Sequence, residues 1–302
     1  MQDDDAQVRL QRLAELPLKP VGPQRGLVAG TVASLRDIAG YRELLVLLVR
    51  RELRARYKNS SLGFVWSLVK PVAQLLIYFV VIGKFLGAAR SIPEFAIFVF
   101  SGLTMWALFN ETVSGGAGAI VANAGLIKKV YLPREVFPLS TVGSAVVNFA
   151  IQFGVLLAGT VVIGSIPWSR RLLYVPVAVV LILVFATALA ILLSAINVYL
   201  RDVQHLIEIV ILILFWASPI VYSFAYVTDF LKGGWLEELY LANPVTLSIL
   251  AFQRGMWEAG ADQPFPAHMP LRLGAALVVS LGLLWLSQRV FARLEGNFAQ
   301  EL

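Results

Sequence analysis

The sequence predicts an all-α integral membrane protein with six transmembrane helices, an N-terminal amphipathic interfacial helix, and short outer helices that are re-entrant or amphipathic. Composition is the first observation: 58% of the 302 residues are hydrophobic and only 15% are charged, whereas soluble domains average about 45–50% apolar and 25% charged. The mean hydropathy is +0.76. The second observation is that apolar residues form repeated runs of about 20, the length that crosses a bilayer. We therefore expect one membrane domain over residues 39–302.

Six apolar runs are candidate spans. They cover residues 64–85, 95–119, 136–164, 172–200, 206–226 and 271–291. Most of the 25 Lys and Arg residues lie before the first run, in the second and fourth loops, and after the last run. Because positive residues are retained on the cytoplasmic side, we expect a multi-pass membrane protein with both termini in the cytoplasm.

Three segments outside the spans have recognisable patterns. Residues 1–38 mix Pro, Gly and charge without strong periodicity, which predicts a mobile cytoplasmic tail. Residues 41–58 have apolar positions at helical spacing, with Arg50, Arg54 and Lys58 on one stripe and Arg56 nearby. This pattern is typical of a helix lying on a membrane surface. Within residues 234–258, two short stretches predict outer helices, the second with Pro244 in its first turn.

Several kinds of chemistry are excluded. There is no cysteine and there are only two histidines, far apart at His205 and His268, which excludes disulfides, thiol catalysis and Cys-based metal sites. The phosphate-binding pattern GxxxxGK[ST] is absent, so we do not expect the chain to hydrolyse ATP. We expect no catalytic residue, no metal and no bound cofactor. Topology explains the basic pI of about 9.6, so we expect no nucleic-acid partner.

Two other classes of membrane protein lack the residues they need. A membrane glycosyltransferase or polymerase requires positioned carboxylates, and the acidic cluster available is Asp3 to Asp5 in the predicted tail. An ion-coupled secondary transporter needs buried charges at mid-membrane and often has inverted repeats. Glu111 alone meets the first requirement, and no repeat is apparent.

Five strings occur in a fixed order along the spans. They are RRELRARYKNSSLGFVWSLVKP (50–71), NAGLIKKVYLPREVFPLS (123–140), NVYLRD (197–202), SPIVY (218–222) and NPVTLSILAFQRG (243–255). Together they resemble the permease subunits of type-2 ABC exporters of the polysaccharide class, which carry O-antigens, capsules, teichoic acids and cell-wall galactans. The resemblance covers roughly residues 40 to 290.

The resemblance implies a function and a set of partners. It implies two copies of this permease with two copies of an ABC ATPase subunit, which would bind ATP and Mg²⁺. It also implies a cargo of lipid-linked polysaccharide (O-antigen, galactan or teichoic-acid-like) moved across the inner membrane. A type-2 ABC permease for a small lipid or drug shares the same plan and remains the alternative.

Two inner segments are candidates for contact with the ATPase. Residues 123–131 combine apolar and basic side chains before Pro133, and the resemblance makes this segment the coupling helix. Its candidate residues are Asn123, Leu126, Ile127, Lys128, Lys129 and Tyr131. The alternative is an ordinary positively charged inner loop. Arg201 and Asp202 resemble a second contact, or form a local ion pair that caps the fifth span.

The remaining candidates concern the path of the cargo. The basic residues Arg50, Arg54, Arg56 and Lys58 could hold anionic membrane lipids, and the resemblance implies a gate helix for a pyrophosphate-linked lipid head. Glu111 either lines a pore or lies at the interface because the second span ends near Gly115 and Gly116. Aromatic candidates for the conduit are Trp66, Tyr78, Phe79, Trp106, Phe215, Trp216 and Tyr222. Their alternative is core packing or an interfacial belt, which suits Trp66 and Tyr222 better.

Overall fold

The computed structural model describes residues 27–57, 65–130 and 132–302, and these residues form helices and turns without a strand. The α-helices are α2 (Leu27–Gly40), α3 (Arg42–Tyr57), α4 (Trp66–Tyr78), α5 (Phe95–Ala122), α6 (Ala124–Ile127), α7 (Val136–Ile163), α8 (Tyr174–Tyr199), α9 (Val203–Trp216), α10 (Phe224–Leu231), α11 (Trp235–Leu241), α12 (Pro244–Met256), α13 (Met269–Leu294) and α14 (Phe298–Glu301). The predicted all-α class is confirmed.

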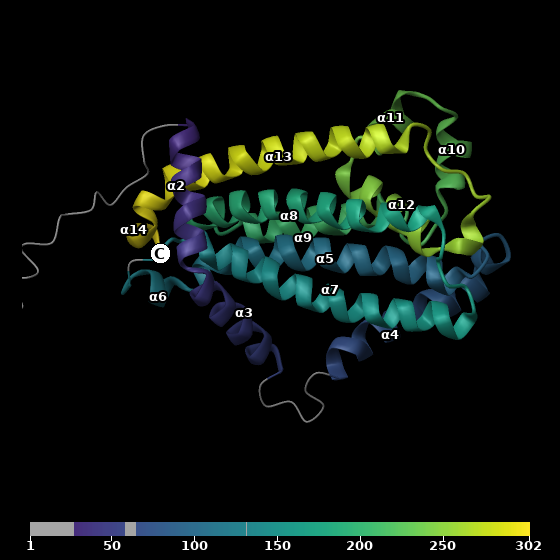
Figure 1. The fold of residues 1–302 in the computed structure, drawn as a ribbon, viewed down its shortest axis with the longest axis horizontal. Coiled ribbons are helices and arrows are strands. Elements are labelled where there is room, and N and C mark those ends of the chain that lie inside the picture. Colours follow the sequence, from purple (N-terminus) through teal and green to yellow (C-terminus); the bar gives the residue numbers. More distant parts are fainter. Residues whose placement is uncertain (1–26, 58–64, 131) are drawn as a thin grey trace, which may run out of the picture.

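Long helices lie side by side along the long axis of the molecule (Figure 1). Helices α10 and α11 stand at one end, which we call the α11 end, and α2, α6 and α14 at the other, the α6 end. In the described part of the chain, five helices are long and apolar enough to cross a membrane: Leu68–Phe85, Phe95–Ala122, Val136–Ile163, Arg170–Tyr199 and Met269–Glu301. These correspond to five of the six predicted spans.

The predicted fifth span is shorter than expected. Helix α9 ends at Trp216 after 14 residues, about 21 Å at 1.5 Å per residue, whereas the hydrocarbon core is about 30 Å thick. Pro219 lies in the non-helical segment that follows, before α10 begins. Side chains bond two carbonyls of this region: Tyr222 Oη donates to Trp216 O at 2.9 Å and Gln253 Nε2 to Pro219 O at 3.0 Å. These bonds satisfy backbone groups that no helix satisfies.

Helix α5 is the central element of the bundle. Of the 18 most apolar consecutive residues of α5, 78% are buried inside the protein, against 6% for the first span. Helices α7, α8, α12 and α4 all contact α5. Glycines allow the closest approach, because a Cβ on Gly116 would lie 2.4 Å from the Cβ of Ala190 in α8. The first span, made of α4 and the π-helix Phe79–Phe85, therefore lies at the margin of the bundle.

The predicted outer helices are present at 235–241 and 244–256. Asn243 caps α12 by accepting a 3.0 Å hydrogen bond from the Val245 N–H, and Pro244 occupies the first turn. Eleven residues of α12 are buried against α5, α8 and α13. Helix α12 is thus packed inside the bundle rather than lying on its surface.

The N-terminal segment is more ordered than a tail would be over part of its length. We expected residues 27–38 to belong to the tail, but they form most of α2, which contacts α13. Residues 1–26 lie outside the described residues. The predicted amphipathic helix is α3, and it packs on α7, while Lys58 lies outside the described part of the chain. Helices α2 and α3 follow each other with only Tyr41 between them.

Candidate functional site

The segment after α5 forms a single helical turn at the α6 end of the bundle (Figure 1). Asn123 ends α5, and its Nδ2 donates a 2.8 Å hydrogen bond to Ala119 O. Ile127 is only 7% exposed and packs in a cluster with Leu48 and Phe298. Because Ile127 anchors the turn from inside, it cannot also be a contact for a partner at the surface.

The outward side of the same turn is basic and apolar. Lys128 and Lys129 are exposed, and Leu126 is half-buried. Val130, four residues after Leu126, is 46% exposed, although it is not among the predicted contacts. Its spacing from Leu126 was the available signal. Tyr131 lies outside the described residues. The surface offered by this segment is therefore Leu126, Lys128, Lys129 and Val130.

The turn between α8 and α9 lies at the same end of the molecule. Arg201 and Asp202 are both exposed there. Just before this turn, Asn197 Nδ2 donates a 3.0 Å hydrogen bond to Ala117 O in α5. Asp202 occupies the position before the first residue of α9, but its side chain makes no capping hydrogen bond. This arrangement gives no support to the capping alternative and leaves the turn available to a partner.

Helix α3 presents a basic face. Arg50 and Arg54 are exposed, and both border an open groove of about 1110 Å³. Within the described part of the chain, the other residues that line the groove also belong to α3: Arg42, Glu43, Val46, Leu47, Arg51 and Ala55. The Arg56 side chain and Lys58 lie outside the described residues. A groove with clustered guanidinium groups and apolar side chains is suited to an amphiphile with an anionic head.

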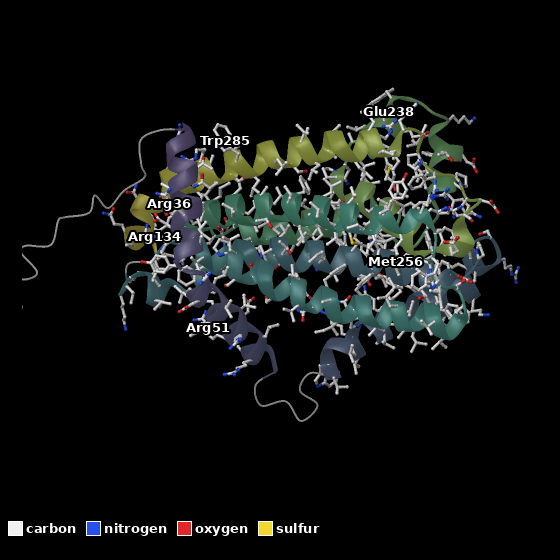
Figure 2. All side chains as sticks on the ribbon, viewed as in Figure 1. Arg36, Arg51, Arg134, Glu238, Met256 and Trp285 are labelled. Carbon is white, nitrogen blue, oxygen red and sulfur yellow. The ribbon has the colours of Figure 1, made fainter. Side chains whose placement is uncertain are left out.

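Helix α3 is also joined to the segment after α5. Arg51 Nη2 donates a hydrogen bond to Asn123 Oδ1, and Figure 2 shows Arg51 at the α6 end. Arg51 is not among the predicted site residues, because it lies one position beyond Arg50 and off the predicted stripe. The bond shows that Asn123 faces α3 within the protein, although we predicted it as a contact for the ATPase.

Glu111 lies well inside α5, which continues to Ala122. The alternative that the second span ends near Gly115 and Gly116 is therefore wrong, since Gly116 is a packing contact with α8. The Glu111 side chain is half-buried, and Asn148 Nδ2 of α7 donates to its Oε2 at 2.7 Å. A partly accessible carboxylate inside a membrane helix faces protein or water rather than lipid, which agrees with a pore-facing position.

Aromatic candidates separate into buried and exposed groups. Trp106 and Phe215 are 7% and 8% exposed, and their ring centroids lie 5.4 Å apart. Tyr78 stacks on Phe215 with centroids 6.1 Å apart, so α4, α5 and α9 share one cluster. The cluster supports the packing alternative for Trp106 and Phe215. Phe79 is half-buried, and the Tyr222 hydroxyl donates its hydrogen bond to the Trp216 carbonyl at the end of α9.

Two aromatic candidates are exposed on the faces of α4 and α9. Trp66 and Trp216 are 51% and 55% exposed. Trp66 borders a groove of about 540 Å³ with Lys70, Gln74 and Ile77 of the same helix. Of the aromatic candidates, these two side chains are the most available to a bound molecule. In the described part of the chain, no group of His, Asp and Glu side chains could hold a metal ion.

Comparison with known proteins gives one family. The model of the ABC-2 type transporter family matches residues 43–257. An O-antigen export system permease protein of Myxococcus xanthus is 34% identical over 271 residues, covering 89% of this chain and 98% of the relative. An O-antigen export system permease protein of Klebsiella pneumoniae is 28% identical over 70% of this chain and 79% of its own length. A capsule polysaccharide export inner-membrane protein of Haemophilus influenzae is 30% identical over 49% of this chain and 56% of its own.

Proposed function

Because the chain belongs to the ABC-2 type transporter family, we propose that it is the permease of an exporter that carries a lipid-linked polysaccharide outward across the bacterial inner membrane. One observation carries the proposal: an O-antigen export permease aligns with this chain over 98% of its own length at 34% identity. The protein is a multi-pass membrane permease and not an enzyme. The cargo would be an O-antigen, a galactan or a teichoic-acid-like polymer.

Energy would come from ATP and Mg²⁺ bound by a separate ATPase subunit. In this arrangement two permeases and two ATPases form the exporter, since closed two-fold pairing is the commonest symmetry of assemblies. The ATPase would dock at the α6 end, which lies in the cytoplasm together with both termini. Its contacts would be Leu126, Lys128, Lys129 and Val130 on one segment and Arg201 and Asp202 on the other. The exposed side chains at both places support this docking face.

The cargo would move along the faces of α4 and α9 that the bundle leaves uncovered. Trp66 and Trp216 stand on these faces, and aromatic planes stack on the C–H faces of sugars without holding them in a deep binding minimum. Glu111 would face the same conduit between the membrane surfaces. A neutral glycan sliding past such side chains would need no fixed binding site.

At the cytoplasmic mouth, the basic groove on α3 would receive the head of the lipid carrier. Arg50 and Arg54 supply guanidinium groups that pair with phosphate oxygens, and Val46 and Leu47 supply an apolar floor. The same basic face would attract anionic lipids of the inner leaflet, at about 1 kcal/mol per basic residue near the surface. In both roles, α3 would be the gate helix at this entrance.

A cell deleted for this gene and complemented with variants tests the proposal. The readouts are surface polymer and co-purification of the ATPase with a tagged permease. Charge reversal at Lys128 and Lys129 should abolish both, because it inverts the potential of the docking face. Reversal of Lys84 and Arg90, which are exposed near the α11 end, is the matched control and should abolish neither.

Two outcomes would overturn the proposal. One is a deletion strain whose surface polymer is unchanged. The other is a purified complex whose ATP hydrolysis is stimulated by a small lipid or drug but not by lipid-linked glycan, which would assign the chain to the alternative cargo.

A further inference from the structure

Two polar contacts join the N-terminal helices to the opposite ends of the segment between α5 and α7. At its start, Arg51 of α3 donates to Asn123 Oδ1. At its end, Ser34 Oγ of α2 donates to Glu135 Oε2 at 2.9 Å. Both contacts link parts of the chain far apart in sequence, 72 and 101 residues respectively. Segment 123–135 is thus held at each end by one of two consecutive helices.

Further hydrogen bonds orient the acceptor side chain of each contact. Asn123 also donates from Nδ2 to Ala119 O at 2.8 Å, so its amide is oriented with Oδ1 toward Arg51. Glu135 is only 6% exposed, and its second oxygen accepts a 2.9 Å hydrogen bond from Gln288 Nε2 of α13. It also occupies the position before the first residue of α7, where the helix dipole favours a negative charge.

The rest of the interface strengthens the connection. A Cβ on Gly143 of α7 would lie 2.7 Å from Cγ2 of Val49, so α3 sits directly on α7. Ser34 and Gln288 both lie outside residues 43–257, the region matched by the family model. The Glu135 contact therefore uses parts of this chain that the family match does not cover.

We propose that Arg51 and Glu135 are positioning residues that fasten α3 and α2 to segment 123–135, so that the helix pair moves with that segment. The inference rests on the proposed function, in which an ATPase displaces the segment. Displacement of a single surface turn would then be passed to the basic groove on α3. Without these contacts, the turn could shift while α3 stayed in place.

Cross-linking tests the common movement directly, because the chain contains no cysteine. Cysteines replacing Ala55, one turn after Arg51, and Ala124, next to Asn123, leave the contact itself in place. They are joined by a bifunctional thiol reagent in the permease–ATPase complex. The complex is compared without nucleotide and after trapping with ATP and vanadate. We expect the same yield of cross-link in both states. Loss of the cross-link on trapping would overturn the proposal.

Export by the purified permease–ATPase complex in proteoliposomes gives the second readout. Arg51→Gln should lower the polymer exported per ATP hydrolysed by about tenfold, because a hydrogen bond to a charged group is lost. Arg36→Gln removes the same charge from an exposed position on α2 and should leave that ratio unchanged. Exchange of the two residues, Arg51→Asn with Asn123→Arg, should restore the ratio, which a purely structural loss would not do.

The possible outcomes distinguish a failure of this inference from a failure of the proposed function. An Arg51→Gln complex that exports as well per ATP as the unaltered protein would overturn the proposal. If Arg51→Gln prevents assembly, the exchange variant decides: restored export supports the contact, and no restoration overturns it. An unaltered permease that recruits no ATPase would overturn both the proposed function and this inference, whereas loss of the cross-link in an assembled complex overturns this inference alone.

Discussion

Gly116 should tolerate no side chain, although alanine favours a helix more than glycine does. A Cβ at this position would lie 2.4 Å from the Ala190 Cβ and 3.1 Å from the Ala190 Cα. Ordinary contacts begin at 3.4 Å, so α5 and α8 would have to separate by about 1 Å. Overpacking of this kind costs about 1–3 kcal/mol. Gly116→Ala should therefore destabilise the permease at its most central helix pair.

Gly115→Ala is a matched control in the adjacent residue. A Cβ on Gly115 would lie 3.5 Å from the Thr141 Cβ and 3.8 Å from its Cγ2, and both are ordinary contacts. Replacement of glycine by alanine in a helix gains up to about 1 kcal/mol, and this gain is common to both variants. The difference between them therefore isolates the packing of α5 on α8.

Thermal unfolding of the two purified variants in the same detergent measures this difference. One kcal/mol shifts the midpoint of unfolding by about 2–4 °C in a chain of 150–250 residues. We expect Gly116→Ala to unfold roughly 2–12 °C below Gly115→Ala on that scale. Equal unfolding temperatures would refute the close contact with α8, and with it the reason for rejecting an early end of the second span.

Three further predictions concern single side chains. Trp216→Ala should reduce surface polymer without lowering the unfolding temperature, whereas the neighbouring Phe215→Ala should cost about 3–5 kcal/mol of stability because the ring is buried. Asn148→Leu removes the 2.7 Å donor to the Glu111 carboxylate and should cost about 1.5–3 kcal/mol in thermal unfolding. Hydrogen bonds from Arg272 of α13 hold the pKa of the Glu238 carboxyl below its usual 4.5. The ion pair that tethers α11 to α13 is therefore fully formed above pH 4.5, and it is lost as the pH falls through the lowered pKa. Protease cleavage after 231–234 should rise in acid, and Glu238→Gln should abolish that pH dependence.

Local patterns predicted elements whose signals lie close together in the sequence. The Asn243-Pro244 pair marks the start of α12 because a capping side chain and a fixed φ act within one turn. The run of residues 206–226 predicted a full span because most of the residues after Trp216 are also apolar. Pro219 interrupts the helix there, and Gln253 and Tyr222, one of them more than 30 residues away, satisfy the freed carbonyls. A hydropathy pattern alone cannot predict these hydrogen bonds.

In the candidate site, too, the sequence predicted local features but not contacts between distant residues. Basic residues at 128 and 129 were predicted as surface contacts, and they are exposed. The roles of Ile127 and Val130 could not be separated, because Ile127 is turned inward only by its place in the buried cluster that includes Leu48 and Phe298. Arg51 was missed for a related reason. Helical spacing places residues on a face of their own helix, while the partner of Arg51 is 72 residues away.

Helix α5 connects the two regions that the proposed function needs. Its last turn ends at Asn123, and near its middle Trp106 packs on Phe215 of α9, whose ring also stacks with Tyr78 of α4. Because a close-packed core passes on displacement rather than absorbing it, we expect a shift at Asn123 to move α4 and α9 together with α5. The uncovered faces of α4 and α9 would then move as one wall. We therefore expect the conduit to open between the two permease copies and not within one of them.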